Sequence, residues 1–119
     1  MTRPALPSRS LEITVDRRGD DAMVRLGGRI DVDSSPDLRE RLHAVLSEES
    51  SPRAVTVDLS GVAYIETSGV ATLIEALRIA RRQQTSLRLQ GLSGAVLRLF
   101  EVTGVLALFE PSDPGQKVS

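Results

Sequence analysis

The chain has 119 residues, which is within the range of a single domain, and its 40% hydrophobic and 26% charged residues are typical of a soluble globular protein and not of a disordered one. Fifteen Lys and Arg against 16 Asp and Glu leave a net charge of -1, which excludes a general attraction to nucleic acid or to an anionic membrane. Cys is absent from the chain, and this excludes disulfides, thiolate metal clusters and thiol nucleophiles.

The two ends of the chain have the composition of loose segments. Residues 1–10 lack the apolar run of a signal peptide, and residues 110–119 are rich in Pro, Ser and Gly. We therefore expect a flexible N-terminal arm over 1–10, one domain over 11–109 and a flexible C-terminal tail over 110–119. Because no stretch approaches the ~20 consecutive apolar residues of a membrane span, we expect a cytoplasmic protein without direct membrane insertion.

Alternating apolar and polar residues open the predicted domain. The alternation over residues 11–15 is typical of a half-buried strand. A turn over 17–21 leads to a second strand that starts near residue 23 and ends near Ile30, and this short link predicts an antiparallel hairpin. Gly27 and Gly28 indicate a bulge or a close backbone approach in the second strand.

A strong helix start follows the hairpin. Ser34 and Ser35 are candidate N-caps, Pro36 suits the first helical position, and Asp37 favours the positive end of the helix dipole. We expect the helix to run to about Ser47. Its apolar residues recur at near-helical spacing and predict one face packed on a sheet: Leu38, Leu42, Val45 and Leu46.

A short apolar run after this helix predicts a central strand. Residues 48–52 are expected to be a linker, and residues 54–59 form the apolar run, with Asp58 at its end. We expect a loop over residues 60–65 after it.

Apolar residues at helical spacing then predict a second helix, which starts near Thr67 or Ser68, runs to about Arg82 and is closed by Gln83 and Gln84. The residues that carry this pattern are Val70, Leu73, Ile74 and Leu77.

The last part of the domain is predicted as strand, helix and strand. Residues 87–89 alternate as a strand, and Ser93 is the candidate cap of a third helix. Thr103 and Gly104 stop that helix, and residues 105–109 are expected to form a short final strand.

The order of elements is thus β-β-α-β-α-β-α-β. Strands that alternate with helices predict an α/β fold with right-handed crossovers and a mixed, mostly parallel sheet of four to five strands, with about three to four helices.

Catalytic constellations are missing from the sequence. His43, the only histidine, lies inside the first predicted helix, where a partly exposed face is a more typical place than a catalytic site. There is no Gly-rich phosphate loop that ends in Lys-Ser or Lys-Thr, and the sole Lys is Lys117 near the end of the chain. We therefore expect a binding protein that is not an enzyme and needs no cofactor.

Metal and nucleic-acid binding are also poorly supported. Asp31 and Asp33 resemble part of a calcium loop but lack the following Gly and the distal Glu, so we expect no metal site. The basic end of the second helix, with Arg78, Arg81 and Arg82, complements the helix dipole. Aromatic residues are only 3% of the chain and cannot supply stacking platforms for nucleic acid. The expected partners are proteins.

The segment Glu66-Thr67-Ser68-Gly69 is the strongest candidate site. It places a carboxylate and two hydroxyls at the start of a helix, next to a Gly that lets another backbone approach closely. On the simpler interpretation, Thr67 or Ser68 accepts a hydrogen bond from a first-turn amide, a cap worth about 1 kcal/mol. On the second interpretation, one hydroxyl is phosphorylated and gains about -1.5 to -2 charges. Glu66 and a nearby Asp31 repel this phosphate, whereas the positive end of the helix dipole tolerates it. The outer surface then becomes strongly negative, which would switch off a protein interface.

Three stretches carry a resemblance to a known family. They are Gly28-Arg29-Ile30-Asp31, Asp58-Leu59-Ser60 with Ile65-Glu66-Thr67-Ser68-Gly69-Val70, and Leu97-Arg98-Leu99-Phe100 with Val102-Thr103-Gly104. Over about Leu11 to Phe109 the chain resembles a STAS domain and is similar to bacterial anti-sigma factor antagonists. The middle stretch is fairly specific, and the others support it by their order and spacing.

The resemblance implies a STAS fold and a partner-switching function. In the family, an unphosphorylated antagonist binds an anti-sigma factor, which is a serine/threonine kinase with a histidine-kinase-like ATPase fold, and so frees the sigma factor. The kinase phosphorylates a Ser or Thr in an Asp-Ser-Ser-Gly or Asp-Ser-Thr-Gly motif, which ends the binding, and a phosphatase restores it.

By position, Glu66 corresponds to the Asp of that motif, Thr67 to the phosphoacceptor and Ser68 to the second hydroxyl, while Asp31 matches an acidic residue near the phosphosite. The resemblance thus implies phosphorylation at Thr67, with Ser68 as second candidate, and partner binding through Asp31, Glu66, Thr67, Ser68 and Gly69.

Two residues depart from the family pattern. Glu66 replaces the usual Asp, and its extra methylene moves the carboxylate. Thr67 replaces the commoner Ser, which keeps the hydroxyl and adds a β-branch.

A second group within the family is also similar in size, with a Thr at the same helix start: the STAS subunit of Mla-type phospholipid-trafficking ABC transporters, where that Thr serves assembly. The antagonist and the transporter subunit are the two functions that the resemblance leaves open.

Overall fold

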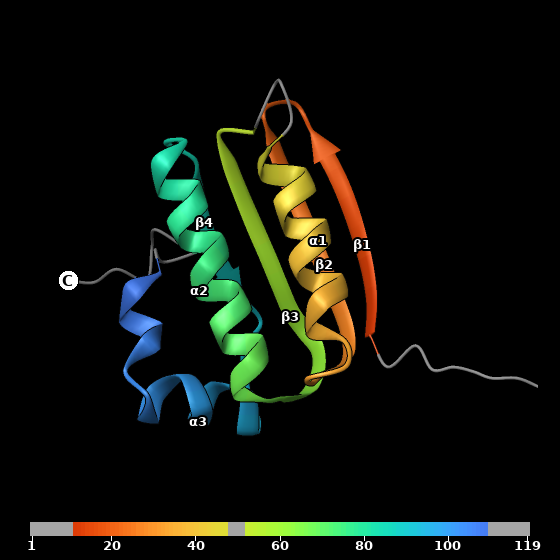
Figure 1. The fold of residues 1–119 in the computed structure, drawn as a ribbon, viewed down its shortest axis with the longest axis vertical. Coiled ribbons are helices and arrows are strands. Elements are labelled where there is room, and N and C mark those ends of the chain that lie inside the picture. The colour runs from red at the N-terminus through yellow and green to blue at the C-terminus, as the bar shows by residue number, and fades with distance from the viewer. Residues whose placement is uncertain (1–10, 48–51, 110–119) are drawn as a thin grey trace, which may run out of the picture.

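The computed structural model describes residues 11–47 and 52–109. Figure 1 shows a sheet with two helices, α1 and α2, side by side across one of its faces. The elements in chain order are β1 (Leu11–Arg18), β2 (Asp21–Ile30), α1 (Ser35–Leu46), β3 (Ala54–Ile65), α2 (Thr67–Arg82), β4 (Ser86–Gln90), α3 (Gly94–Val102) and a 3-10 helix, η1 (Val105–Leu108). The expected arm, tail and most of the expected linker, residues 1–10, 110–119 and 48–51, lie outside the described residues.

The sheet has four strands in the order β1-β2-β3-β4. β1 and β2 pair antiparallel, whereas β3 pairs parallel with both β2 and β4. Each parallel pair is joined through a helix, α1 or α2, as the alternation of strands and helices predicts. The opening hairpin and the mixed, mostly parallel sheet are therefore confirmed.

The predicted irregularity in β2 is confirmed as well. The β2–β3 register shifts between Arg25 and Gly27 and again between Gly28 and Arg29. A Cβ placed on Gly61 of β3 would lie 2.9 Å from the carbonyl oxygen of Leu26 and 3.2 Å from the Cα of Gly27. The two strands approach here more closely than side chains would allow.

The central strand is longer than the sequence pattern predicts. β3 continues to Ile65, so the expected loop over residues 60–65 is wrong, and Asp58 lies inside the strand and not at its end. The alternation of buried and less buried residues breaks after Leu59, where Ser60 and Gly61 are both exposed, and burial resumes at Val62 and Ile65. The backbone nevertheless stays extended, because β2 continues to pair with it as far as Ile65.

The core lies between the sheet and the two covering helices. Its largest fully buried side chains come from every layer of the fold: Phe100, Ile30, Leu38, Leu42, Leu46, Leu59, Leu73 and Leu87. The apolar faces predicted for α1 and α2 include Leu38, Leu42, Leu73 and Leu77, and all four are buried. None of the helices in the described segments combines the length and apolarity that a bilayer crossing needs.

The end of the domain corrects one expectation. Residues 105–108 form a 3-10 turn and not a strand. Gly104 adopts a left-handed conformation with φ of 73°, which reverses the chain after α3. The turn then brings Phe109 back against Phe100, with ring centroids 6.4 Å apart. Packing of this aromatic pair, and not pairing with β4, places the segment.

Gly69 lets α2 begin close to the sheet. A Cβ on this residue would overlap Cγ2 of Ile30 and lie 2.9 Å from Cγ1 of Ile65. The close approach is thus made by two side chains, whereas the sequence led us to expect a neighbouring backbone. Ile30 is fully buried and β-branched, so its side chain has little freedom to move away.

We therefore predict that Gly69→Ala destabilises the protein. Overpacking costs about 1–3 kcal/mol, whereas the better helix propensity of Ala returns at most about 1 kcal/mol. The free energy of unfolding, measured in urea by circular dichroism, is expected to fall. Ala71→Ser on the exposed side of the same helix is the control and should change it by less than about 0.5 kcal/mol. Unchanged or increased stability of Gly69→Ala would contradict the packing argument.

Candidate functional site

The candidate site lies where two neighbouring parallel strands end. β2 ends at Ile30 and β3 ends at Ile65, and these two residues are register partners. The backbone N–H of Glu66 donates to the carbonyl oxygen of Ile30 at 2.8 Å, which extends the pairing by one bond. The loop that begins with Asp31 is therefore held against the start of α2.

Glu66 ties this loop to the helix. Its Oε1 accepts a hydrogen bond from the backbone N–H of Val32 at 3.2 Å. Its Oε2 accepts one from the hydroxyl of Tyr64 at 2.9 Å. The carboxylate is thus fixed between a residue of the β2–α1 loop and a side chain of β3.

Thr67 is the first residue of α2 and is exposed. The expectation that Thr67 or Ser68 caps the helix with its hydroxyl is wrong, because the N-cap residue is Glu66 and no side chain makes a capping bond. Both hydroxyls already belong to the first turn, where their residues have helical geometry. Within residues 11–47 and 52–109 the hydroxyl of Thr67 makes no side-chain hydrogen bond, and the residue is exposed at the N-terminus of α2.

Ser68 has a different environment from Thr67. It is half-buried, and its Oγ lies 3.2 Å from the Oγ of Ser35, the first residue of α1. Ser35 in turn donates to the carbonyl oxygen of Asp31 at 2.7 Å. Because the Ser35 proton is used in that bond, Ser68 is the donor in the contact between the helices. Its hydroxyl therefore joins α2 to α1.

Asp31 organises the loop before α1. Its Oδ1 accepts hydrogen bonds from the backbone N–H groups of Asp33 and Ser34, both at 3.0 Å. The bond from the Ser34 N–H is the main reason why the pKa of Asp31 lies below its ordinary value. Oδ2 lies 3.6 Å from Nε of Arg29. Asp31 thus contributes a negative charge beside Glu66 while it holds the loop in shape.

Three residues that the sequence did not single out as functional complete the surface: Arg29, Val32 and Tyr64. The guanidinium carbon of Arg29 lies 4.2 Å from the centroid of the Tyr64 ring, a cation–π contact. Tyr64 is 38% exposed and Val32 is 65% exposed. Tyr64 precedes Glu66 by two positions, so strand alternation, which puts i and i+2 on one face, was the available signal.

A groove leads away from this surface between α1 and α2. It is lined by Val32, Ser35, Pro36, Arg39, Glu40, His43, Ser68, Ala71 and Thr72. Arg39 donates to both carboxylate oxygens of Glu75, at 2.9 and 3.1 Å, which lowers the pKa of Glu75. His43 is half-buried, and its Nε2 lies 3.5 Å from Glu75. It thus contacts a carboxylate that already pairs with Arg39.

The chemistry of the surface is that of a binding site. It offers the hydroxyl of an exposed threonine at a helix start, two carboxylates, one guanidinium and two exposed apolar side chains. No group of three or more metal-ligating side chains occurs among residues 11–47 and 52–109. The arrangement suits protein contact and a phosphate on the hydroxyl.

The bond between Tyr64 and Glu66 predicts a measurable titration. The hydrogen bond to Glu66, followed by burial and the negative charge of Glu66, raises the pKa of Tyr64. Since the chain has one Tyr and no Trp, phenolate absorbance reports this residue alone. We expect a midpoint above the ordinary value of about 10, and a lower midpoint in Glu66→Gln.

The matched control is Glu101→Gln, which removes an exposed carboxylate of α3 and should leave the midpoint of Tyr64 where it is. A midpoint in Glu66→Gln equal to or above that of the unmodified chain would contradict the bond.

Comparison with known proteins agrees with the fold. A family model described as "Mlab, STAS domain" matches residues 13–110. The anti-sigma-B factor antagonist of Bacillus subtilis is 29% identical over 103 residues, which cover 87% of this chain and 92% of that protein. The anti-sigma-B factor antagonist of Listeria monocytogenes is 32% identical over 101 residues, which cover 85% and 86%.

Solved structures share the fold. An anti-sigma factor antagonist from Mycobacterium paratuberculosis superposes with a TM-score of 0.73 at 23% identity, covering 86% of this chain and 85% of that one. The unphosphorylated form of the anti-sigma factor antagonist SpoIIAA gives 0.71 at 14% identity, covering 88% and 91%. The STAS model matches most of this chain, and the antagonists to which the chain is similar have about the same length. This chain therefore belongs to the STAS domain family and, within it, to the anti-sigma factor antagonists.

Proposed function

We propose that this protein binds a kinase-type anti-sigma factor in the cytoplasm, so that the sigma factor is released, and that phosphorylation of Thr67 ends the binding. A phosphatase would restore it. The observation that carries the proposal is the exposed position of Thr67 at the start of α2, beside the fixed carboxylate of Glu66.

Accessibility favours Thr67 over Ser68 as the acceptor. A kinase must bring its nucleotide phosphate in line with the hydroxyl oxygen, and Thr67 is exposed. Ser68 is half-buried, and its hydroxyl is engaged with Ser35 on the neighbouring helix. Phosphorylation of Ser68 would break the contact between α1 and α2, whereas a phosphate on Thr67 leaves it intact.

Electrostatics explains how a phosphate would act at this position. It adds about -1.5 to -2 charges to Thr67, next to Glu66 and close to the loop of Asp31. The first-turn amides of α2 and the helix dipole offset part of this charge, so the domain stays folded. The outer surface becomes strongly negative, and a partner that fits the unmodified surface is repelled.

Arg29, Val32 and Tyr64 are proposed contacts for the anti-sigma factor, together with Asp31, Glu66, Thr67 and Ser68, while Gly69 supports this surface from below. Tyr and Arg are the side chains most often found to dominate binding energy at interfaces. Here the ring of Tyr64 is held by Arg29 on one side and by Glu66 at its hydroxyl. Gly69 is buried, so its contribution is the packing of α2 against Ile30.

Glu66 can serve where most of the family has Asp because this chain supplies partners for the longer side chain. The bonds from Val32 and Tyr64 hold both carboxylate oxygens. We infer that the cognate kinase recognises this arrangement and that Glu66→Asp, which shortens the reach, weakens its recognition.

The first test is made on the protein isolated from its native cells, growing and stressed. Intact-mass analysis and phosphopeptide mapping should find a phosphate on Thr67 whose occupancy changes with condition. Thr67→Ala should abolish it, while Ser68→Ala should keep it on Thr67. Complete absence of phosphate on Thr67 under every condition, or phosphate on Ser68 alone, would contradict the switch.

The second test measures binding to the anti-sigma kinase that copurifies with the unmodified chain. Thr67→Glu should weaken binding at least about tenfold, equivalent to about 1.4 kcal/mol, because it places a negative charge on the contact surface. Thr67→Ser, which keeps the hydroxyl, is the matched control and should bind normally. Equal affinity of Thr67→Glu and the unmodified chain would oppose the proposal.

The Mla-type transporter subunit stays a second candidate because the matching family model is described as "Mlab, STAS domain". In that case the chain should copurify with a membrane permease and its ATPase and not with a soluble kinase. Affinity purification from native membranes, followed by mass spectrometry, separates the two functions.

A further inference from the structure

The free edge of β1 is a regular strand. β1 has eight residues, it pairs with β2 in continuous register from Leu11 to Arg18, and no proline interrupts it. In Figure 1 it forms the outer edge of the sheet, and no described element lies beyond it. An edge strand of this length presents a row of backbone donors and acceptors that a further strand can pair with.

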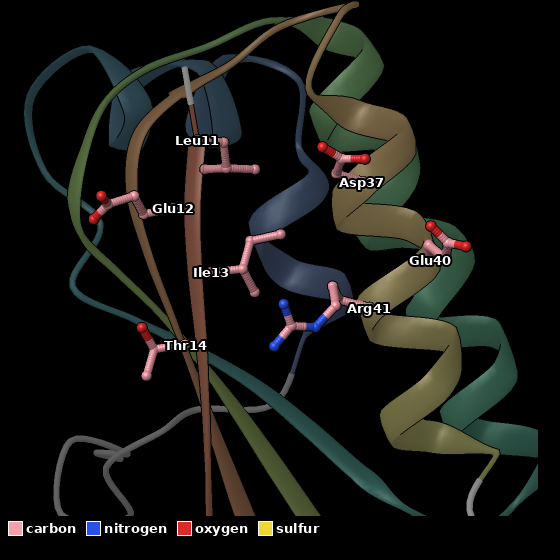
Figure 2. A pocket seen from close by; sticks show the side chains of 7 residues that line it. All are labelled: Leu11, Glu12, Ile13, Thr14, Asp37, Glu40 and Arg41. Carbon is pink, nitrogen blue, oxygen red and sulfur yellow. The ribbon is translucent and has the colours of Figure 1, made fainter. Parts of the chain in front are cut away.

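Partly exposed apolar side chains lie along this free edge of the sheet. Ile13 and Val15 on the helix-facing side of β1 are only half-buried, although they pack against the core. A groove runs between β1 and α1 at Leu11 and Ile13, and in Figure 2 the guanidinium of Arg41 extends from α1 toward Ile13. The groove would be closed by a second strand laid along β1.

The charges of the edge are arranged so that the strand complements itself. Glu12 lies at one end of β1, where the groove is lined by two acidic residues of α1, Asp37 and Glu40, and one basic residue, Arg41. Arg17 and Arg18 lie at the other end. When two copies of such a strand pair antiparallel, the basic end of each lies beside the acidic end of the other.

The charges also select one register. A two-fold axis perpendicular to the sheet keeps the helices of both copies on the same side, so a residue can oppose only residues whose side chains share its face. With Val15 on the axis, Glu12 of each copy opposes Arg18 of the other. With Thr14 on the axis, Glu12 would oppose Asp16, a destabilising pair of like charges.

We propose that the protein forms a symmetric homodimer through antiparallel pairing of β1 with β1 of a second copy, with Val15 on the two-fold axis. The dimer has one continuous sheet across both copies. Because the axis reverses the strand direction, the two Thr67 sites lie at opposite ends of this sheet, and both stay free. The dimer therefore does not depend on the function proposed for Thr67.

A single introduced thiol tests the register, since the chain has no Cys of its own. Directly opposed residues have Cβ atoms about 4.5–5.5 Å apart, close to what a disulfide requires. Val15→Cys should form a disulfide-linked dimer under mild oxidation, seen on a non-reducing gel. Thr14→Cys is the matched control and should stay largely monomeric, because Thr14 opposes Asp16 in this register.

Charge reversal tests the complementarity. Glu12→Arg and Arg18→Glu should each weaken the dimer by roughly three- to tenfold, since each changes two symmetric pairs. The double variant should restore the affinity. Arg98→Glu on exposed α3 should have no effect. The measurement is sedimentation equilibrium of the full chain, with thermal unfolding by circular dichroism to show that each variant is folded.

Three results would overturn the inference. The first is a monomer of the unmodified chain at high micromolar concentration. The second is faster cross-linking of Thr14→Cys than of Val15→Cys, which would place another residue on the axis. The third is a double charge variant no tighter than the single ones, which would show that Glu12 and Arg18 do not meet.

Discussion

The parallel pairing of β2 with β3 is the constraint on which the site depends. The pairing passes a bulge where Gly27 and Gly61 lie close together, and it continues until Ile30 opposes Ile65. Since parallel strands end at the same edge of a sheet, the loop after β2 and the start of α2 meet there. The bond from the Glu66 N–H to the Ile30 carbonyl then closes the junction. Without this register, Asp31 would have no fixed relation to Thr67.

The hydroxyls of Thr67 and Ser68, which are adjacent in the sequence, lie in different environments at this junction. Ser68 points between the helices and bonds to Ser35, so it contributes to the packing of α1 against α2. Thr67, one residue earlier, is turned about 100° around the helix axis by the 3.6-residue repeat and is exposed. A helix start thus gives one residue a structural role and leaves its neighbour accessible, while the first-turn amides favour any negative charge placed there.

The surface around Thr67 is held in place by contacts among its own side chains. The carboxylate of Glu66 is held by the hydroxyl of Tyr64 and the amide of Val32, and Arg29 covers the ring of Tyr64. These contacts reduce the number of conformations that Glu66 and Tyr64 must lose when a partner binds, which is one source of affinity at interfaces.

Local patterns determined the order of the elements, the apolar faces of α1 and α2 and the place of Thr67 at a helix start, because periodicity and turn residues act over a few positions. The tertiary structure alone decided that residues 60–65 are strand, since their pairing partner β2 lies more than thirty positions earlier in the chain. It also made residues 105–108 a 3-10 turn, through the packing of Phe109 on Phe100. The contact of Ser68 with Ser35 and the bond from the Val32 N–H to Glu66 follow from the same cause: contacts between segments that the sheet brings together have no signature in either segment alone.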